Sequence, residues 1–145
     1  MKVSIRHTGI VVEDLDRAIY FWQDVMGLSV RSRALEEGPF ISTILAIPSV
    51  SVTTVKLVSD TNECIELLKY HSLESPVNNH PLFGCGITHI ALTVADLEEC
   101  FIKLKACDLD FLSDPQISPC GLFKVVFARA HDGIMLELVE HQPSL

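Results

Sequence analysis

The chain contains an internal repeat, which constrains its fold more than any other feature of the sequence. Residues 5–18 read IRHTGIVVEDLDRA, and residues 87–100 read ITHIALTVADLEEC. Five positions are identical between the two copies: Ile5, His7, Val12, Asp14 and Leu15 return as Ile87, His89, Val94, Asp96 and Leu97. We therefore expect two copies of one structural module within the chain.

Each copy has the pattern of a short strand followed by a helix. IRHTGIVV and ITHIALTV are rich in β-branched residues, which favour strands. Asp14 and Asp96 then stand where a helix N-cap is expected. Apolar residues follow at helical spacing and predict one buried face per helix: Leu15, Ala18, Ile19, Trp22 and Val25 in the first copy, and Leu97, Cys100, Phe101, Leu104 and Cys107 in the second.

Three strand-like segments follow each predicted helix. They are FISTILAIP, SVSVTTVKLVS and CIELLKY in the first half, and DFLSDP, LFKVVFARA and IMLELVE in the second. Each half thus has the order strand, helix and three strands, which predicts an α+β fold. We expect a single domain over residues 1–145, made of modules 3–70 and 86–140 joined by linker 71–85.

The linker region, HSLESPVNNHPLFGCG, is rich in Pro, Asn, Ser and Gly. Loops of this length are unusual inside a compact domain and are often functional or simple connectors. Two interpretations remain open: a connector between modules, or a flap over a binding site. The histidines at 71 and 80 would line such a flap.

The composition argues against some classes of binding partner. The 145 residues carry a formal net charge of −8, which argues against binding to nucleic acid or to an anionic membrane surface. Residues 38–55 are uncharged, but Pro39 and Pro48 interrupt them, so two short strands are expected there rather than a membrane-spanning helix. Five cysteines without a CxxC pair, and no signal peptide, predict free thiols in the cytoplasm.

The last strand of each half carries a glutamate between apolar residues. Glu66 lies in IELL and Glu137 lies in LELV. Burying a carboxylate in an apolar strand is costly unless a cation or hydrogen bonds offset the cost. Taken singly, a strand histidine is usually structural and a strand glutamate usually faces solvent. Together, His7, Glu66, His89 and Glu137 form a repeat-matched set able to bind one divalent metal: Zn²⁺, Ni²⁺, Co²⁺, Fe²⁺ or Mn²⁺.

The motifs that carry these residues resemble one known superfamily. HTGIVVEDLDRAIYFWQDVMGL, CIELLKY, GITHIALTVADLEE and HDGIMLELVE are similar to segments of the vicinal oxygen chelate superfamily, which includes glyoxalases, bleomycin resistance proteins and extradiol dioxygenases. The resemblance covers residues 3–140. It implies two tandem βαβββ modules forming a curled mixed sheet around a metal.

The resemblance also implies an activity. His7, Glu66, His89 and Glu137 would be the metal ligands of a glyoxalase I-like lyase or isomerase, which moves a proton next to a carbonyl of a small-molecule substrate. Glu137 is the first choice for the catalytic base. Glu66, its equivalent in the first repeat, is the second candidate for that role. Family members usually dimerise, so a homodimer is expected, with the metal within one chain or between two.

Alternative functions within the same superfamily stay open. One is an acyl-CoA epimerase, in which Glu36 or Glu37 supplies a further base. Another is a non-catalytic binding or resistance protein, and an extradiol dioxygenase is the remotest. Arg31 and Arg33 are candidates for pairing with an acidic substrate.

Overall fold

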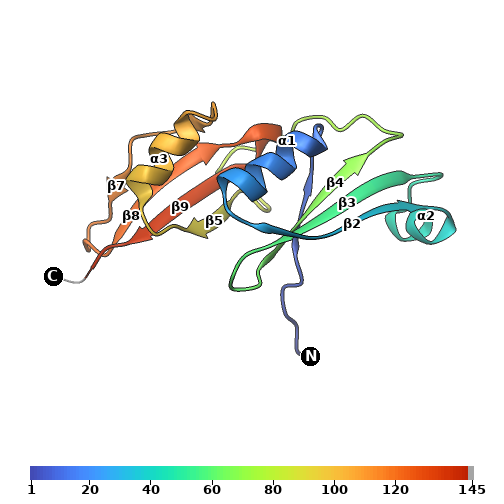
Figure 1. Cartoon of the computed structure of the whole chain (residues 1–145), viewed down its shortest axis with the longest axis horizontal. Helices are drawn as coiled ribbons and strands as arrows, with labels where there is room; N and C mark the ends of the chain where they lie inside the picture. The colour runs from blue at the N-terminus through green and yellow to red at the C-terminus, as the bar shows by residue number, and fades with distance from the viewer. Residues whose placement is uncertain (144–145) are drawn as a thin grey trace. The chain divides into compact units, whose positions relative to one another are not determined.

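The computed structural model describes residues 1–143 and divides into two compact units, Met1–Pro76 and Val77–Leu145. The last two residues of the predicted domain, 144 and 145, lie outside the described residues. Each unit combines a mixed sheet with few helices (Figure 1), which confirms the predicted α+β fold class. That the two units make up a single domain stays a prediction.

The first unit is built on a four-stranded sheet in the order β1-β4-β3-β2. β1 pairs parallel with β4, while the β4–β3 and β3–β2 pairs are antiparallel. The elements follow the chain as β1 (Thr8–Val11), α1 (Leu15–Tyr20), the π-helical turn η1 (Phe21–Val25), β2 (Ser29–Glu37), α2 (Pro39–Leu45), β3 (Ser51–Val58) and β4 (Cys64–Tyr70).

The second unit repeats this plan, but with two strands of two residues each where the first unit has the nine-residue β2. Its sheet has the order β5-β9-β8-β6, with β7 also paired to β8, and β5 is parallel to β9. Its elements are β5 (Ile90–Thr93), α3 (Leu97–Lys105), β6 (Asp110–Phe111), β7 (Gln116–Ile117), β8 (Phe123–Arg129), the 3-10 turn η2 (His131–Gly133) and β9 (Met135–His141). The parallel first–last strand pair is therefore present in both units.

One predicted strand of the first half is wrong. FISTILAIP does not form the first of the three later strands, because residues Pro39–Leu45 are the helix α2, and the strand is instead β2. Gly38 has a φ of 95°, and Pro39 stands in the first turn of α2, where its ring favours a helix start. β2 was not predicted because nearly all its residues are exposed, so it lacks buried alternation.

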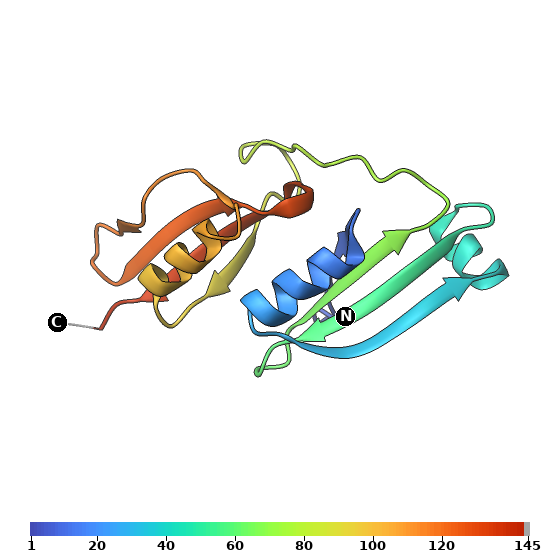
Figure 2. The ribbon, with the colours of Figure 1, turned by 45° about the horizontal axis from the view of Figure 1, so that its top comes forward.

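The two faces of the first sheet are covered differently. α1 lies against β4 (Figure 2), and Trp22 of the following turn η1 is only 1% exposed. Ile41 of α2 packs with Val52 and with the partly buried Leu68 and Tyr70. Side chains alternate along a strand, so α2 covers one end of the face that also carries Glu66.

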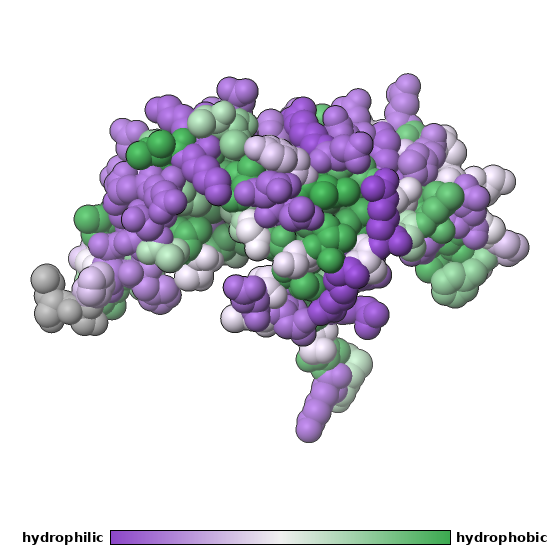
Figure 3. All heavy atoms as spheres, in the orientation of Figure 1, coloured by the Kyte–Doolittle hydropathy of each residue, from purple (hydrophilic) through white to green (hydrophobic). Residues whose placement is uncertain are grey.

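The outer surface of α2 is apolar. Phe40 and Ile44, one helical turn apart, are 75% and 59% exposed. Figure 3 shows hydrophobic side chains gathered over this helix. No helix within residues 1–143 is long and apolar enough to cross a membrane.

Candidate metal centre

The first unit brings His7 and Glu66 together. His7 immediately precedes β1, and Glu66 on β4 is paired with Gly9 of β1. The parallel pairing of these strands places the imidazole Nε2 2.9 Å from Glu66 Oε2. Glu66 is the only charged residue among the buried positions of residues 1–143, at 8% exposure. A buried carboxylate of this kind needs polar partners, and His7 is one of them.

The second unit brings His89 and Glu137 together in the same way. His89 immediately precedes β5, and Glu137 on β9 is paired with Ala91 of β5. His89 Nε2 lies 3.3 Å from Glu137 Oε2, and the Glu137 side chain is 24% exposed, against 11% for Glu66. The two pairs occupy equivalent registers, so each repeat presents one imidazole nitrogen and one carboxylate.

In both imidazoles the nitrogen that faces a carboxylate is Nε2. His7 Nδ1 is buried and has no hydrogen-bond partner among residues 1–143, while His89 Nδ1 lies 2.9 Å from the Thr88 hydroxyl. Nε2 is therefore the nitrogen that both rings present beside a carboxylate. Neutral imidazole and carboxylate are ordinary ligands for divalent transition metals.

The spacing within each pair fits two neighbouring ligands of one ion. Metal–ligand distances of about 2.1 Å and ligand angles of about 90–110° put adjacent donor atoms roughly 3.0–3.4 Å apart. The observed nitrogen–oxygen separations are 2.9 and 3.3 Å. Within the described part of the chain, however, no three His, Cys, Asp or Glu side chains gather as a metal-binding group. Each unit thus supplies two donors.

A lysine that is not among the predicted site residues also contacts the first pair. Lys56 on β3 is paired with Glu66 across the sheet, and its Nζ lies 3.0 Å from Glu66 Oε1. The equivalent position opposite Glu137 is Phe127 on β8, whose ring contacts the His89 ring at 5.4 Å between centroids. Lys56 lies in an apolar run, SVTTVKLVS. A charge in such a run was the available signal, but its partner depends on strand register.

Three of the four other predicted site residues, all on β2, have local hydrogen-bond partners. Arg31 donates a hydrogen bond to the Asn62 side chain, and Arg33 is exposed. Glu36 accepts a hydrogen bond of 3.2 Å from Thr54, and Glu37 accepts one of 2.6 Å from Ser51. None of the four has a described contact with the His7–Glu66 pair, so the structure does not join them to it.

Comparison with known proteins identifies related sequences. The model of the Glyoxalase/Bleomycin resistance protein/Dioxygenase superfamily matches residues 4–138. A lactoylglutathione lyase from Schizosaccharomyces pombe is 28% identical over 145 residues, an alignment that covers 94% of this chain and 47% of the relative. The chain thus spans about half the length of that relative.

Solved structures show the same fold. A glyoxalase family protein from Bacillus cereus superposes with a TM-score of 0.89 at 23% identity, covering 99% of this chain and 97% of that one. A fosfomycin resistance protein from Listeria monocytogenes, solved with Mn(II) and sulfate, gives a TM-score of 0.61 at 14% identity and covers 98% and 95% of the two chains.

Proposed function

Because the chain belongs to the Glyoxalase/Bleomycin resistance protein/Dioxygenase superfamily, we propose that it is a metal-dependent lyase or isomerase of the glyoxalase I type. The observation that carries this proposal is the pair of repeat-equivalent histidine–glutamate contacts, at 2.9 and 3.3 Å. His7, Glu66, His89 and Glu137 are the proposed ligands of one divalent ion, bound within one chain or between two copies.

The residues of the site have distinct proposed tasks. When bound, the ion supplies Lewis acidity to two adjacent oxygens of the substrate. His7 and His89 hold the ion through Nε2. Glu137 takes the proton from the carbon next to the carbonyl and returns it to the neighbouring carbon. Its greater exposure than Glu66, 24% against 11%, supports this choice, because a base must reach the substrate.

The comparisons support this proposal at a coarser level. The fission yeast relative is a lactoylglutathione lyase, and the Listeria structural neighbour was solved with Mn(II). The substrate we propose is accordingly a small 2-oxoaldehyde joined to a thiol, such as the adduct of methylglyoxal and glutathione.

The direct test is turnover of that adduct by protein loaded with Ni²⁺, Co²⁺, Zn²⁺, Fe²⁺ or Mn²⁺. We expect Glu137→Gln to lower kcat by at least about 100-fold, since general acid–base groups contribute roughly 10²–10⁴-fold. Glu99→Gln is the matched control, because Glu99 is an exposed glutamate of the same unit. Equal rates for wild type and Glu137→Gln would contradict the proposed role of Glu137.

Parallel assays separate the alternative functions. Proton exchange on methylmalonyl-CoA without turnover of the glutathione adduct would identify an epimerase instead. Oxygen consumption with catechols would identify a ring-cleaving dioxygenase. Tight ligand binding without chemistry on any of these substrates would identify a binding or resistance protein.

A further inference from the structure

The two histidine–glutamate pairs differ in one neighbour. Lys56 faces Glu66 across β3 and β4, whereas Phe127 faces Glu137 across β8 and β9. Both oxygens of Glu66 consequently have a partner: Oε2 lies 2.9 Å from His7, and Oε1 lies 3.0 Å from Lys56. Within residues 1–143, the one ion-pair partner of Glu137 is His89. The two repeats thus offer the same donor atoms, but in the described part of the chain the glutamate of the first repeat has a lysine partner that the glutamate of the second repeat lacks.

From this asymmetry we propose that Lys56 is a positioning residue for the metal site. Its ammonium holds Oε1 of Glu66 and leaves Oε2, beside His7 Nε2, as the oxygen offered to the ion. Lys56 thereby holds Glu66 in place as a metal ligand. Among the described residues Glu137 has no lysine partner, and it is free to accept a proton and return it. This inference rests on the proposed function, since it assigns a role around the same metal.

Two opposing effects of Lys56 on metal affinity must be weighed. Its positive charge repels a divalent cation, and it also orients the carboxylate that binds the cation. Lys56 contacts Oε1, whereas the oxygen offered to the ion is Oε2, so the ammonium and the ion lie on different oxygens of the carboxylate. The Glu66 side chain is 11% exposed and depends on protein partners for its orientation. We therefore expect the loss of orientation to be the larger effect, and the sign of the change in metal affinity decides between the two. Removing groups that hold metal ligands typically weakens metal affinity by about 10–100-fold.

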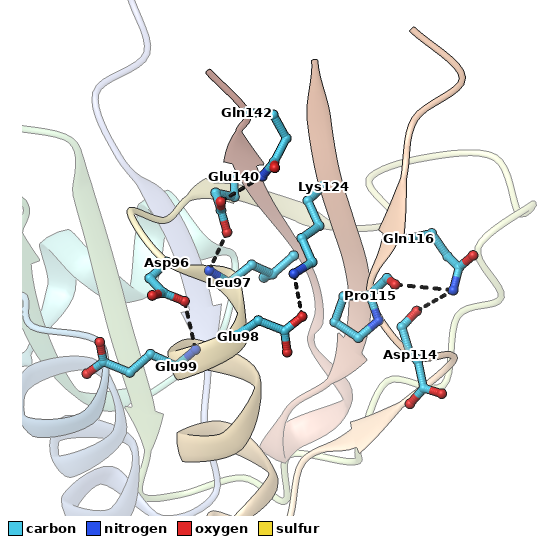
Figure 4. Close-up of polar contacts among 10 residues, drawn as sticks. All are labelled: Asp96, Leu97, Glu98, Glu99, Asp114, Pro115, Gln116, Lys124, Glu140 and Gln142. Atoms are coloured by element: carbon cyan, nitrogen blue, oxygen red, sulfur yellow. Dashed lines mark hydrogen bonds and ion pairs between the residues drawn. The ribbon is translucent and has the colours of Figure 1, made fainter. Parts of the chain in front are cut away.

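The test measures Co²⁺ affinity by visible absorption of the bound ion, without any substrate. Lys56→Met removes the ammonium and keeps an unbranched apolar side chain, Lys56→Gln keeps a neutral N–H donor, and Lys56→Arg keeps the charge. Lys124→Met is the matched control: Lys124 lies on β8, contacts Glu98 of α3 (Figure 4), and is paired across the sheet with Glu140, not with Glu137.

We expect Lys56→Met to raise the Co²⁺ dissociation constant by about tenfold or more, with Lys56→Gln intermediate. Lys56→Arg and Lys124→Met should stay close to wild type. If Lys56→Met does not fold, the difference between Lys56→Gln and Lys56→Arg decides the same question.

Three results would overturn the inference. Unchanged or tighter Co²⁺ binding by Lys56→Met would show that the ammonium does not position Glu66. Equal losses in Lys56→Arg and Lys56→Met would show that packing, not charge, is responsible. Absence of Co²⁺ binding by the wild type would overturn the proposed function as well, whereas binding that is insensitive to Lys56 would overturn this inference alone.

Discussion

At the scale of single residues, hydrogen bonds and burial give chemically similar groups different properties. All five thiols are free, but Cys100 is partly buried and Cys120 is exposed. Desolvation raises the pKa of the Cys100 thiol above its usual value. A hydrogen bond from the Ser118 hydroxyl, 3.2 Å from the sulfur, lowers the pKa of Cys120. The thiolate is the reactive form, so the two cysteines should differ in reactivity.

We therefore predict that Cys120 is alkylated by iodoacetamide well before Cys100. Its rate should begin to rise at a lower pH, because a lowered pKa gives thiolate at lower pH. Ser118→Ala should shift that rise to higher pH by removing the hydrogen bond. Peptide mass spectrometry across a pH series measures each site, and a Cys120 profile unaffected by Ser118→Ala would contradict this account.

At the scale of elements, the two repeated helices begin as their sequences predict. Asp14 accepts a hydrogen bond from the backbone N–H of Arg17 at 3.0 Å, and Asp96 accepts one from Glu99 at 2.9 Å. α3 has a second acceptor, because Glu140 of β9 accepts from the N–H of Leu97 at 2.7 Å (Figure 4). These acceptors satisfy N–H groups that have no partner within the helix. The caps fix where each helix begins after its strand.

Replacing a cap should have a measurable and specific cost. We predict that Asp14→Ala and Asp96→Ala each lower the free energy of unfolding by about 1 kcal/mol, the usual value of an N-cap. Asp14→Asn and Asp96→Asn should retain most of the stability, since the amide oxygen also accepts a hydrogen bond. Urea unfolding followed by circular dichroism measures both pairs, and an asparagine as damaging as alanine would argue against capping.

At the scale of the whole molecule, the proposed site draws one half of its ligands from each repeat. His7 and Glu66 belong to the first unit, and His89 and Glu137 to the second. If all four hold the same ion, removing a ligand of either unit should affect one shared binding event. If each pair bound its own ion, the two effects would be independent.

We predict a stoichiometry of one divalent ion per chain. At an ion concentration of 100 times the dissociation constant, binding should stabilise the folded protein by about 2.7 kcal/mol. His7→Ala and His89→Ala should each remove most of this stabilisation, and His141→Ala, which changes an exposed histidine of β9, should not. Thermal unfolding with and without Ni²⁺ measures the effect, and two ions per chain would contradict the shared site.

The homodimer expected from the family resemblance is also a property of the whole molecule. The exposed apolar pair Phe40 and Ile44 on α2 is a surface that association would cover. We predict a dimer by light scattering coupled to size-exclusion chromatography. A monomer at all concentrations would contradict this prediction.

The sequence alone determined the features that depend on neighbouring residues. The repeat, the caps at Asp14 and Asp96, and the apolar strands around Glu66 and Glu137 are all readable from local patterns, and they led to the fold class and to four candidate ligands. The helix Pro39–Leu45 was mistaken for a strand because a short apolar run fits either structure until its packing against Val52 is known.

Only the tertiary structure decided which side chains face one another. The contacts of Glu66 with His7 and Lys56 follow from the parallel pairing of β1 with β4 and the antiparallel pairing of β3 with β4. A shift of one residue in either register would turn Glu66 to the opposite face. Register is set by the pairing and packing of all the strands together. The sequence therefore indicated the histidines and glutamates but not the lysine that distinguishes the first pair from the second.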